Sequence, residues 1–293
     1  MEGVSVGVPN LIKIADKYNA KLTFAVCPEV VGYFPKDTSH EIGLHIHPGW
    51  QEYQKQGIKF YVGDLYLRKH CQQSTNSTVL MDYSYEEQLE MIKTGKDYLE
   101  EKLGTNLKSF VAGRWSINNN TVKALIESGI THECSAPAHS RADHYDWSRL
   151  PRICMPYHPS ELDYQSKGEL PILIVPITQM LRNGNVNPEV APFVGFSWLK
   201  ACFLEYYNQN LPCFHICLHS PCMVDPYFKK VMDNLLKFIA SHKNIDFRFA
   251  SDIEMYDEVY PKTNILPYLL GANREIIKRN LMPIGSMIFG VRK

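Results

Sequence analysis

Short apolar runs alternate with helical patterns along most of this chain. Each run has the length of a strand, and an amphipathic stretch usually separates it from the next run. Such alternation predicts a mostly parallel sheet with helices on its outside. With about seven candidate strands, we expect an α/β fold, a closed or nearly closed β/α barrel. The candidate strands are residues 22–26, 42–46, 108–112, 130–134, 171–176, 212–218 and 245–250.

Local signals mark two helices with particular clarity. Ser84, with Glu87 three residues later, predicts a capping box at the start of a helix, and Gly104 predicts its end. Asn118 and Gly129 bracket the second helix in the same way. Residues 50–81 show no clean period, and a connection of that length is usually functional or a lid. Further helices are expected at residues 9–19, 196–207, 225–242, 251–258 and 272–281.

Composition narrows the class of protein. The chain has 293 residues, enough for one large domain with an appendage. Lys plus Arg and Asp plus Glu are both 31, and this balance argues against a nucleic acid or an anionic membrane surface as the main partner. No apolar run is long enough to span a bilayer or to act as a signal peptide, so we expect a cytoplasmic protein. The 8 cysteines form no C-x-x-C pair, which makes a cysteine-based zinc site unexpected.

The pair His45 and His47 is the main chemical feature. Both lie at the end of the apolar run 42–46, before Pro48 and Gly49. Side chains alternate along a strand, so the two imidazoles point the same way, with Cα atoms about 6.5–7 Å apart. They can converge on one metal ion, because imidazole is the commonest metal ligand among side chains. A pair that only forms hydrogen bonds is the alternative.

Several segments, in order, resemble the polysaccharide deacetylase family, the carbohydrate esterases of the chitin-oligosaccharide deacetylase type. Each motif is weak alone, but their order and spacing carry the resemblance from about Gly3 to Val259. The segments are a helix and strand at 7–26, a histidine motif at 39–47, an arginine motif at 110–116, a Leu-x-His strand end at 216–220 and a last strand at 247–251.

The resemblance implies a distorted (β/α)7 barrel with one divalent metal, zinc by default, at its mouth. The family removes an acetyl group from an N-acetylated sugar. His45 and His47 would then bind the metal, and His219 would protonate the leaving amine. Arg114 would orient the carboxylate that serves as base, or bind substrate.

The chain departs from the family pattern in three places. The family carries an Asp-Asp pair at the end of its first strand, whereas here only Glu2 lies in that neighbourhood, as a substitute metal ligand and base. Two interpretations are open: an Asp lies upstream of Met1, in a member truncated at its N-terminus, or the base is lost. Gly49 stands at the family's usual second histidine, with His47 as substitute. Val111 stands where the family often has arginine.

The expected function is therefore a metal-dependent deacetylase of an N-acetylated sugar. A cytoplasmic precursor of a surface polysaccharide fits better than a finished wall polymer. Two alternatives are a catalytically degenerate deacetylase fold that binds a glycan or a protein, and another barrel metallohydrolase of the amidohydrolase kind. We expect residues 1–259 to form the barrel domain and 260–293 a helical, apolar extension packed on it.

Overall fold

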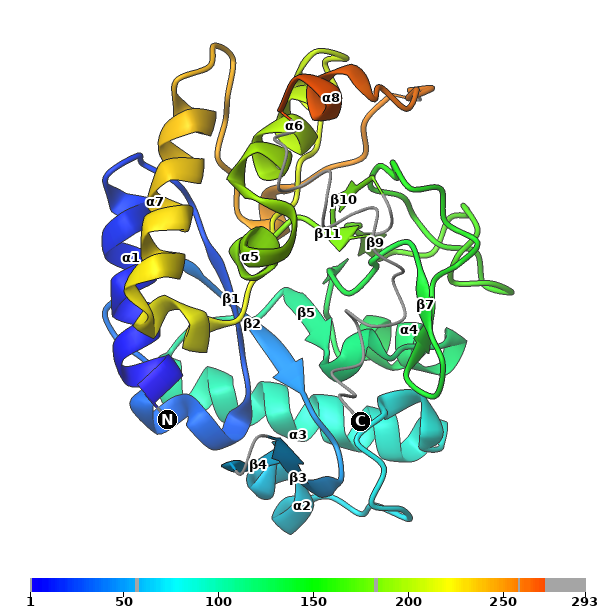
Figure 1. Cartoon of the computed structure of the whole chain (residues 1–293). Coiled ribbons are helices and arrows are strands. Elements are labelled where there is room, and N and C mark those ends of the chain that lie inside the picture. The colour runs from blue at the N-terminus through cyan, green and yellow to red at the C-terminus, as the bar shows by residue number, and fades with distance from the viewer. Residues whose placement is uncertain (1, 56–57, 182–183, 258, 272–293) are drawn as a thin grey trace, which may run out of the picture.

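A five-stranded parallel sheet forms the centre of the protein in a computed structural model, which describes residues 2–55, 58–181, 184–257 and 259–271 (Figure 1). The strand order is β1-β2-β5-β6-β9, so each strand pairs with the next one along the main α/β repeat. In register, Leu44 lies opposite Phe110, and His45 lies opposite Val111. The strands are β1 (Thr23–Val26), β2 (Glu41–Ile46), β5 (Ser109–Ala112), β6 (His132–Glu133) and β9 (Leu173–Ile174).

Helices cover the outside of the sheet, as the alternation predicts. Helices α1 and α7 lie side by side (Figure 1), and Asp233 of α7 accepts hydrogen bonds from Lys17 and Tyr18, at 3.1 and 3.0 Å. Leu44, Ile46 and Phe110 are almost fully buried in the main hydrophobic core. The longer helices are α1 (Val8–Asp16), α3 (Tyr85–Leu103), α4 (Asn119–Glu127), α6 (Phe196–Tyr207) and α7 (Pro226–Ala240).

The two helices with clear local signals begin where the sequence predicts. Ser84 and Glu87 form the capping box of α3, with bonds of 3.2 and 2.9 Å to each other's backbone N–H. Gly104 ends the helix at φ 65°, a conformation that glycine adopts without steric cost. At α4, Asn118 accepts a 3.0 Å bond from the Thr121 N–H. Local hydrogen bonds of this kind need no tertiary partner.

Two expected strands, 212–218 and 245–250, lie beside the sheet but do not join its ladder, which corrects the sequence prediction. The first lies against Thr178, whose N–H donates to the His215 carbonyl at 3.1 Å, and whose hydroxyl accepts from the His215 N–H at 2.8 Å. Pro176 has no N–H to donate, so the ladder of β9 cannot run on through this position. The second segment reaches β1 through a 2.8 Å bond from the Ala250 N–H to the Thr23 hydroxyl.

These two segments extend the five-stranded sheet toward a barrel. The α/β class and the barrel-type architecture predicted from the sequence are confirmed. The residues that the structure describes include no helix both long and apolar enough to cross a membrane. The expected helix at 272–281 lies outside the described residues.

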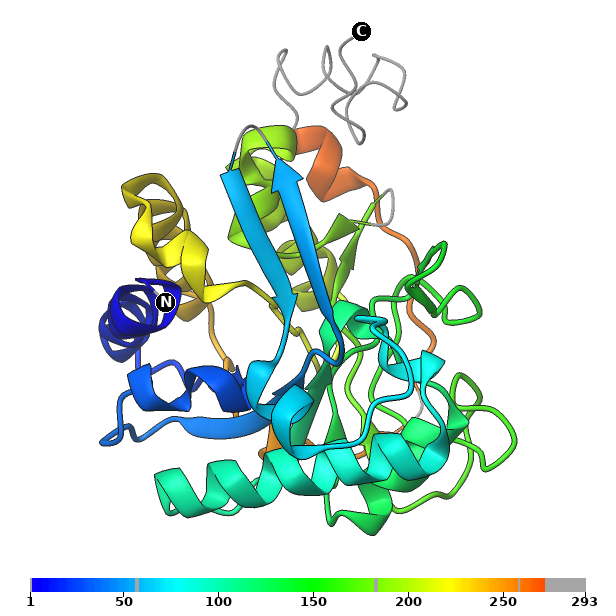
Figure 2. The same cartoon turned by 90° about the horizontal axis from the view of Figure 1, so that it is seen from below.

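The described residues between 50 and 81 include a two-stranded arm followed by a short helix. Strands β3 (Trp50–Lys55) and β4 (Ile58–Gly63) pair antiparallel directly after β2 ends, and Figure 2 shows these two blue strands in front of the other elements. Gly49 and Gly63 lie together at the base of this arm, where the chain enters and leaves it, with φ of 64° and 137°. Helix α2 (Leu65–His70) follows, and Asp64 accepts a bond from the Leu67 N–H at its start.

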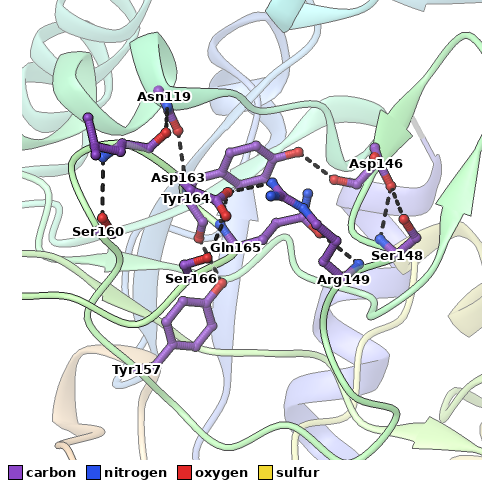
Figure 3. A network of polar contacts seen from close by, with 11 residues as sticks. Asn119, Asp146, Ser148, Arg149, Tyr157, Ser160, Asp163, Tyr164, Gln165 and Ser166 are labelled. Carbon is purple, nitrogen blue, oxygen red and sulfur yellow. Dashed lines mark hydrogen bonds and ion pairs between the residues drawn. The ribbon is translucent and has the colours of Figure 1, made fainter.

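A polar network connects residues 136–168, the irregular excursion that follows β6. The Arg149 guanidinium pairs with Asp163 at 2.5 Å, and the Arg149 backbone N–H donates to the Gln165 side chain at 3.1 Å (Figure 3). The Tyr164 N–H donates to Asn119 of α4 at 2.9 Å, which ties the excursion to the helix layer. The excursion contains the small hairpin β7 (Ser140–Arg141) and β8 (Tyr145–Asp146).

A buried carboxylate joins the C-terminal described segment to α6. Glu205 is fully buried and accepts hydrogen bonds from both terminal nitrogens of Arg152, at 2.9 and 2.5 Å. The Asn264 N–H and the Tyr268 hydroxyl also donate to it, at 2.8 and 3.0 Å. The remaining elements are η1 (Gly3–Gly7), η2 (Pro28–Tyr33), η3 (Leu80–Asp82), η4 (Gly113–Trp115), β10 (Gln179–Met180), β11 (Gly184–Asn185), η5 (Pro188–Val190), α5 (Ala191–Val194), η6 (Ser220–Val224), η7 (Ala250–Asp252) and α8 (Leu266–Gly271).

Residues 251–258, predicted as a helix capped by Ser251, contain only the short helix η7, which already includes Ser251. The rest of that range has no regular helix among its described residues.

Candidate metal and proton-transfer site

His45 and His47 lie together at the end of β2, as the strand pattern predicts. Their ring centroids are 4.7 Å apart and the rings are perpendicular. His45 shares a 2.7 Å hydrogen bond between its Nδ1 and the Val111 carbonyl of β5. Because a carbonyl only accepts, Nδ1 carries the proton and Nε2 keeps its lone pair. A backbone carbonyl that fixes the ring in this way is a common partner of metal-binding histidines.

His47 follows the last residue of β2 and packs against Gly113. A Cβ atom at Gly113 would lie 2.5 Å from Nδ1 of His47 and 2.5 Å from the Ile46 carbonyl oxygen. Only a glycine therefore lets the imidazole occupy this place. Nδ1 of His47 is buried without a hydrogen-bond partner. A buried nitrogen without a hydrogen-bond partner destabilises the folded state by about 1–3 kcal/mol. Where a native structure keeps such a group, the group often has a functional role.

Both imidazoles are held in the neutral form. Burial lowers the pKa of His45 to about 4. Burial also lowers the pKa of His47 well below its usual value, and the charges of His45, Arg114 and His219 lower it further. A neutral imidazole is the form that binds a metal ion. The chemistry of this pair therefore fits a divalent cation.

His219 lies close enough to this pair for its charge to lower the pKa of both rings. It follows the irregular segment 212–218 and precedes η6. Glu189 accepts from its backbone N–H at 2.7 Å and lies 3.0 Å from its Nδ1. The hydrogen bond to Glu189 raises the pKa of His219, although partial burial opposes the effect. The side chain is 74% exposed, so an incoming substrate can reach it.

Glu189 is a site residue that sequence reasoning missed. It lies in η5, 30 residues before His219. The local signal in the sequence, Asn187 before Pro188, marks the start of a helical turn and says nothing about a distant histidine. Only the fold brings the carboxylate to the imidazole.

Arg114 lies in η4, two residues after the end of β5, and both it and Trp115 adopt left-handed backbone conformations, with φ of 56° and 53°. Its Nε donates to the Thr78 hydroxyl at 2.7 Å. Its two terminal nitrogens bond to the Tyr53 hydroxyl and to Nε2 of His144. Gly113, the residue before Arg114, packs against the His47 ring, and the charge of Arg114 contributes to lowering the pKa of His47.

Glu2 is exposed at the start of η1, where the chain is helical. Its neighbour Gly3 packs against Pro221, two residues after His219. The Glu2 carboxylate is not among the groups that shift the pKa of His45, His47 or His219. Within residues 2–55, 58–181, 184–257 and 259–271, no three His, Cys, Asp or Glu side chains form a group that could hold a metal ion. The described residues thus offer two imidazole ligands and no third.

The fold and this histidine pair define a protein of the α/β barrel kind with a potential cation site at the carboxyl end of β2. No protein-family model matches the sequence, and no curated protein matches it either. One similar solved structure is described as a "putative polysaccharide deacetylase" from Mycobacterium smegmatis. It is 17% identical, with a TM-score of 0.54, over 88% of this chain and 82% of that chain.

Another similar structure is Puue allantoinase, at 19% identity and a TM-score of 0.52, over 86% of this chain and 72% of that chain. At such identities the likeness concerns the fold. It supports the deacetylase-type barrel predicted from the sequence.

Proposed function

We propose that this protein is a metal-dependent hydrolase that removes an acetyl group from an N-acetylated sugar. The observation that carries the proposal is the meeting of two neutral imidazoles, His45 and His47, with a third, protonatable one, His219. The similarity in fold to a protein described as a polysaccharide deacetylase supports the substrate class. The sugar is a cytoplasmic precursor of a surface polysaccharide in this proposal.

His45 and His47 would hold the divalent cation, with zinc as the first candidate. Such an ion supplies a polarised acetyl carbonyl and a bound water of lowered pKa. His45 contributes a lone pair whose direction the Val111 carbonyl fixes. Gly113 leaves the space in which the His47 ring lies. The remaining ligands in this proposal are water and substrate.

His219 is the proton donor of the proposal. Amide cleavage expels an amine, which must receive a proton as the bond breaks. Glu189 raises the pKa of His219, and so keeps more of the ring in its acid form near neutral pH. It also fixes the proton on Nδ1 and thereby orients the ring. The proposal assigns no base, because Glu2 is exposed and is not among the groups that shift the pKa of the three histidines.

Metal content tests the proposal directly. After incubation with zinc and dialysis, the wild-type protein should retain about one zinc ion per chain by elemental analysis, as expected for a mononuclear site. His45→Ala and His47→Ala should lose it, whereas His70→Ala, which changes an exposed histidine of α2, should not. Acetate release from N-acetylglucosamine oligomers and from a nucleotide-linked N-acetyl sugar then tests the reaction. Removing a general acid typically costs a factor of about 10²–10⁴, which is the loss expected for His219→Ala.

Two other functions are open to the same tests. The lack of a third ligand among the described residues favours a catalytically degenerate fold that binds a glycan or protein. Absence of metal from the wild-type protein, together with sugar binding without acetate release, would establish that function. The similarity to an allantoinase favours a second alternative, a metallohydrolase of another amide, amidohydrolase-like in its chemistry. This alternative would be established if the protein retained metal and hydrolysed a cyclic amide but released no acetate from N-acetylated sugars.

A further inference from the structure

The guanidinium of Arg114 is a cation without an anionic partner among the described residues. Its three hydrogen bonds go to neutral groups: the hydroxyls of Thr78 and Tyr53, and the ring of His144. None of the ion pairs found in the described part of the chain involves Arg114. By contrast, Arg149 and Arg152 in the segment after β6 each pair with a carboxylate.

The geometry leaves part of the guanidinium available. An arginine carries five N–H donors in a planar fork. The three bonds use one N–H from each nitrogen, and one N–H remains on each terminal nitrogen. Two N–H groups of this kind match the two oxygens of a carboxylate or a phosphate. The Tyr53 ring, 5.4 Å from the guanidinium carbon, supports the cation from β3.

A second positive charge, that of Arg141, acts on the same histidine ring as Arg114. Burial lowers the pKa of His144 most, and the charges of Arg114 and Arg141 lower it further. The carboxylate described at this site, Glu189, already pairs with His219. Both arginines would therefore attract a negatively charged ligand that reaches Arg114.

The backbone of Arg114 also costs stability. Arg114 and Trp115 are consecutive non-glycine residues in the left-handed region, at about 1–2 kcal/mol each. Thr78 lies in the connection before α3, Tyr53 in β3 and His144 between β7 and β8, so three separate segments fix the side chain. A strained residue held this firmly beside the histidine pair is better explained by a ligand than by folding alone.

We propose that Arg114, held by Thr78, Tyr53 and His144, binds an oxyanion of the substrate, a carboxylate or a phosphate. This inference rests on the proposed function for the identity of the neighbouring site, and it narrows the substrate to an anionic sugar or sugar conjugate. A nucleotide-linked or phosphorylated sugar supplies a phosphate, and a uronic acid supplies a carboxylate.

Calorimetric titration of the full, metal-free chain tests the proposal, with inorganic phosphate and glucuronate as probes at constant ionic strength. The wild-type protein should bind at least one probe, and Arg114→Gln should weaken binding at least about tenfold, the scale of a charge-assisted hydrogen bond. Arg149→Gln removes an arginine from the network of Figure 3 and should bind like the wild type. Tighter phosphate binding identifies a phosphate, and tighter glucuronate binding a carboxylate.

Arg114→Lys keeps the charge but loses the planar fork, so it should fold and bind the preferred probe several-fold more weakly. Failure of both probes to bind the wild-type chain overturns the proposal. Equal affinity in the wild type and the lysine variant, or in the wild type and a folded glutamine variant, overturns it too. These titrations need no metal, so they test the anion site independently of zinc retention by His45 and His47. Either proposal can therefore be contradicted while the other is supported.

Discussion

Glu189 accepts from the backbone N–H of His219 at 2.7 Å and lies 3.0 Å from the Nδ1 of the same residue. One carboxylate thereby fixes both the position and the tautomer of an exposed imidazole. The pKa of His219 is raised, chiefly by this hydrogen bond, while that of Glu189 is lowered, although burial alone would raise it. An aligned, protonatable histidine beside two neutral ones is the feature on which the proposed chemistry depends.

The first prediction concerns this pair. Glu189→Gln should move the titration of His219 to lower pH, because the ring loses the partner that favours its charged form. The raised His219 pKa stabilises the fold below about 6.5, and the lowered Glu189 pKa stabilises it above about 4.5. The pair should therefore contribute most near pH 5.5, by less than about 1 kcal/mol because His219 is exposed. Proton NMR titration of the histidines measures the shift, and an unchanged His219 titration contradicts the assignment.

The second prediction concerns acid stability of the metal-free protein. The pKa of His45 is about 4 in the fold, below its ordinary 6.5, so the unfolded chain binds more protons between these values. The free energy of unfolding should consequently fall as the pH is lowered from 6.5 to 4. Urea unfolding at several pH values measures this slope, and His45→Gln should flatten it. A variant with the same slope as the wild type would show that other groups cause the acid lability.

The third prediction concerns Gly113. Gly113→Ala places a methyl group 2.5 Å from the His47 ring and from the Ile46 carbonyl, so the ring or the backbone must move. Overpacking of this kind costs about 1–3 kcal/mol. We expect a lower melting temperature and loss of retained zinc. Gly32→Ala is the control, since its methyl group meets no atom within 4 Å. Full zinc retention by Gly113→Ala would argue against His47 as a ligand.

The fourth prediction concerns Glu205. Glu205→Ala leaves Arg152 without its carboxylate in the interior, and breaking one partner of a buried pair costs about 3–5 kcal/mol. Urea denaturation should show a loss of this size. Glu127→Gln removes a pair with Lys93 in which both side chains are about half exposed, and should change stability by less than about 1 kcal/mol. If the two variants lost equal stability, the buried network would have no special role.

Much of the secondary structure follows from signals within a few residues. Ser84 and Glu87 cap α3 through bonds to each other's backbone, and Asn118 caps α4 in the same way. The strand alternation that predicts His45 and His47 on one face is also local. Local signals of this kind could not predict whether residues 212–218 and 245–250 join the sheet. A segment becomes a strand only through hydrogen bonds to a neighbouring strand. Pro176 has no N–H to donate, so segment 212–218 does not form a ladder with β9.

By itself, the sequence determined the α/β class, the capped helices and the adjacency of two histidines, because each depends on the periodicity or geometry of neighbouring residues. The tertiary structure alone decided that Glu189 reaches His219, that Tyr53, Thr78 and His144 hold Arg114, and that Glu2 lies on the surface. Those contacts join segments far apart in the chain. Their partners are selected by the packing of the whole sheet and its helices, which no local pattern contains.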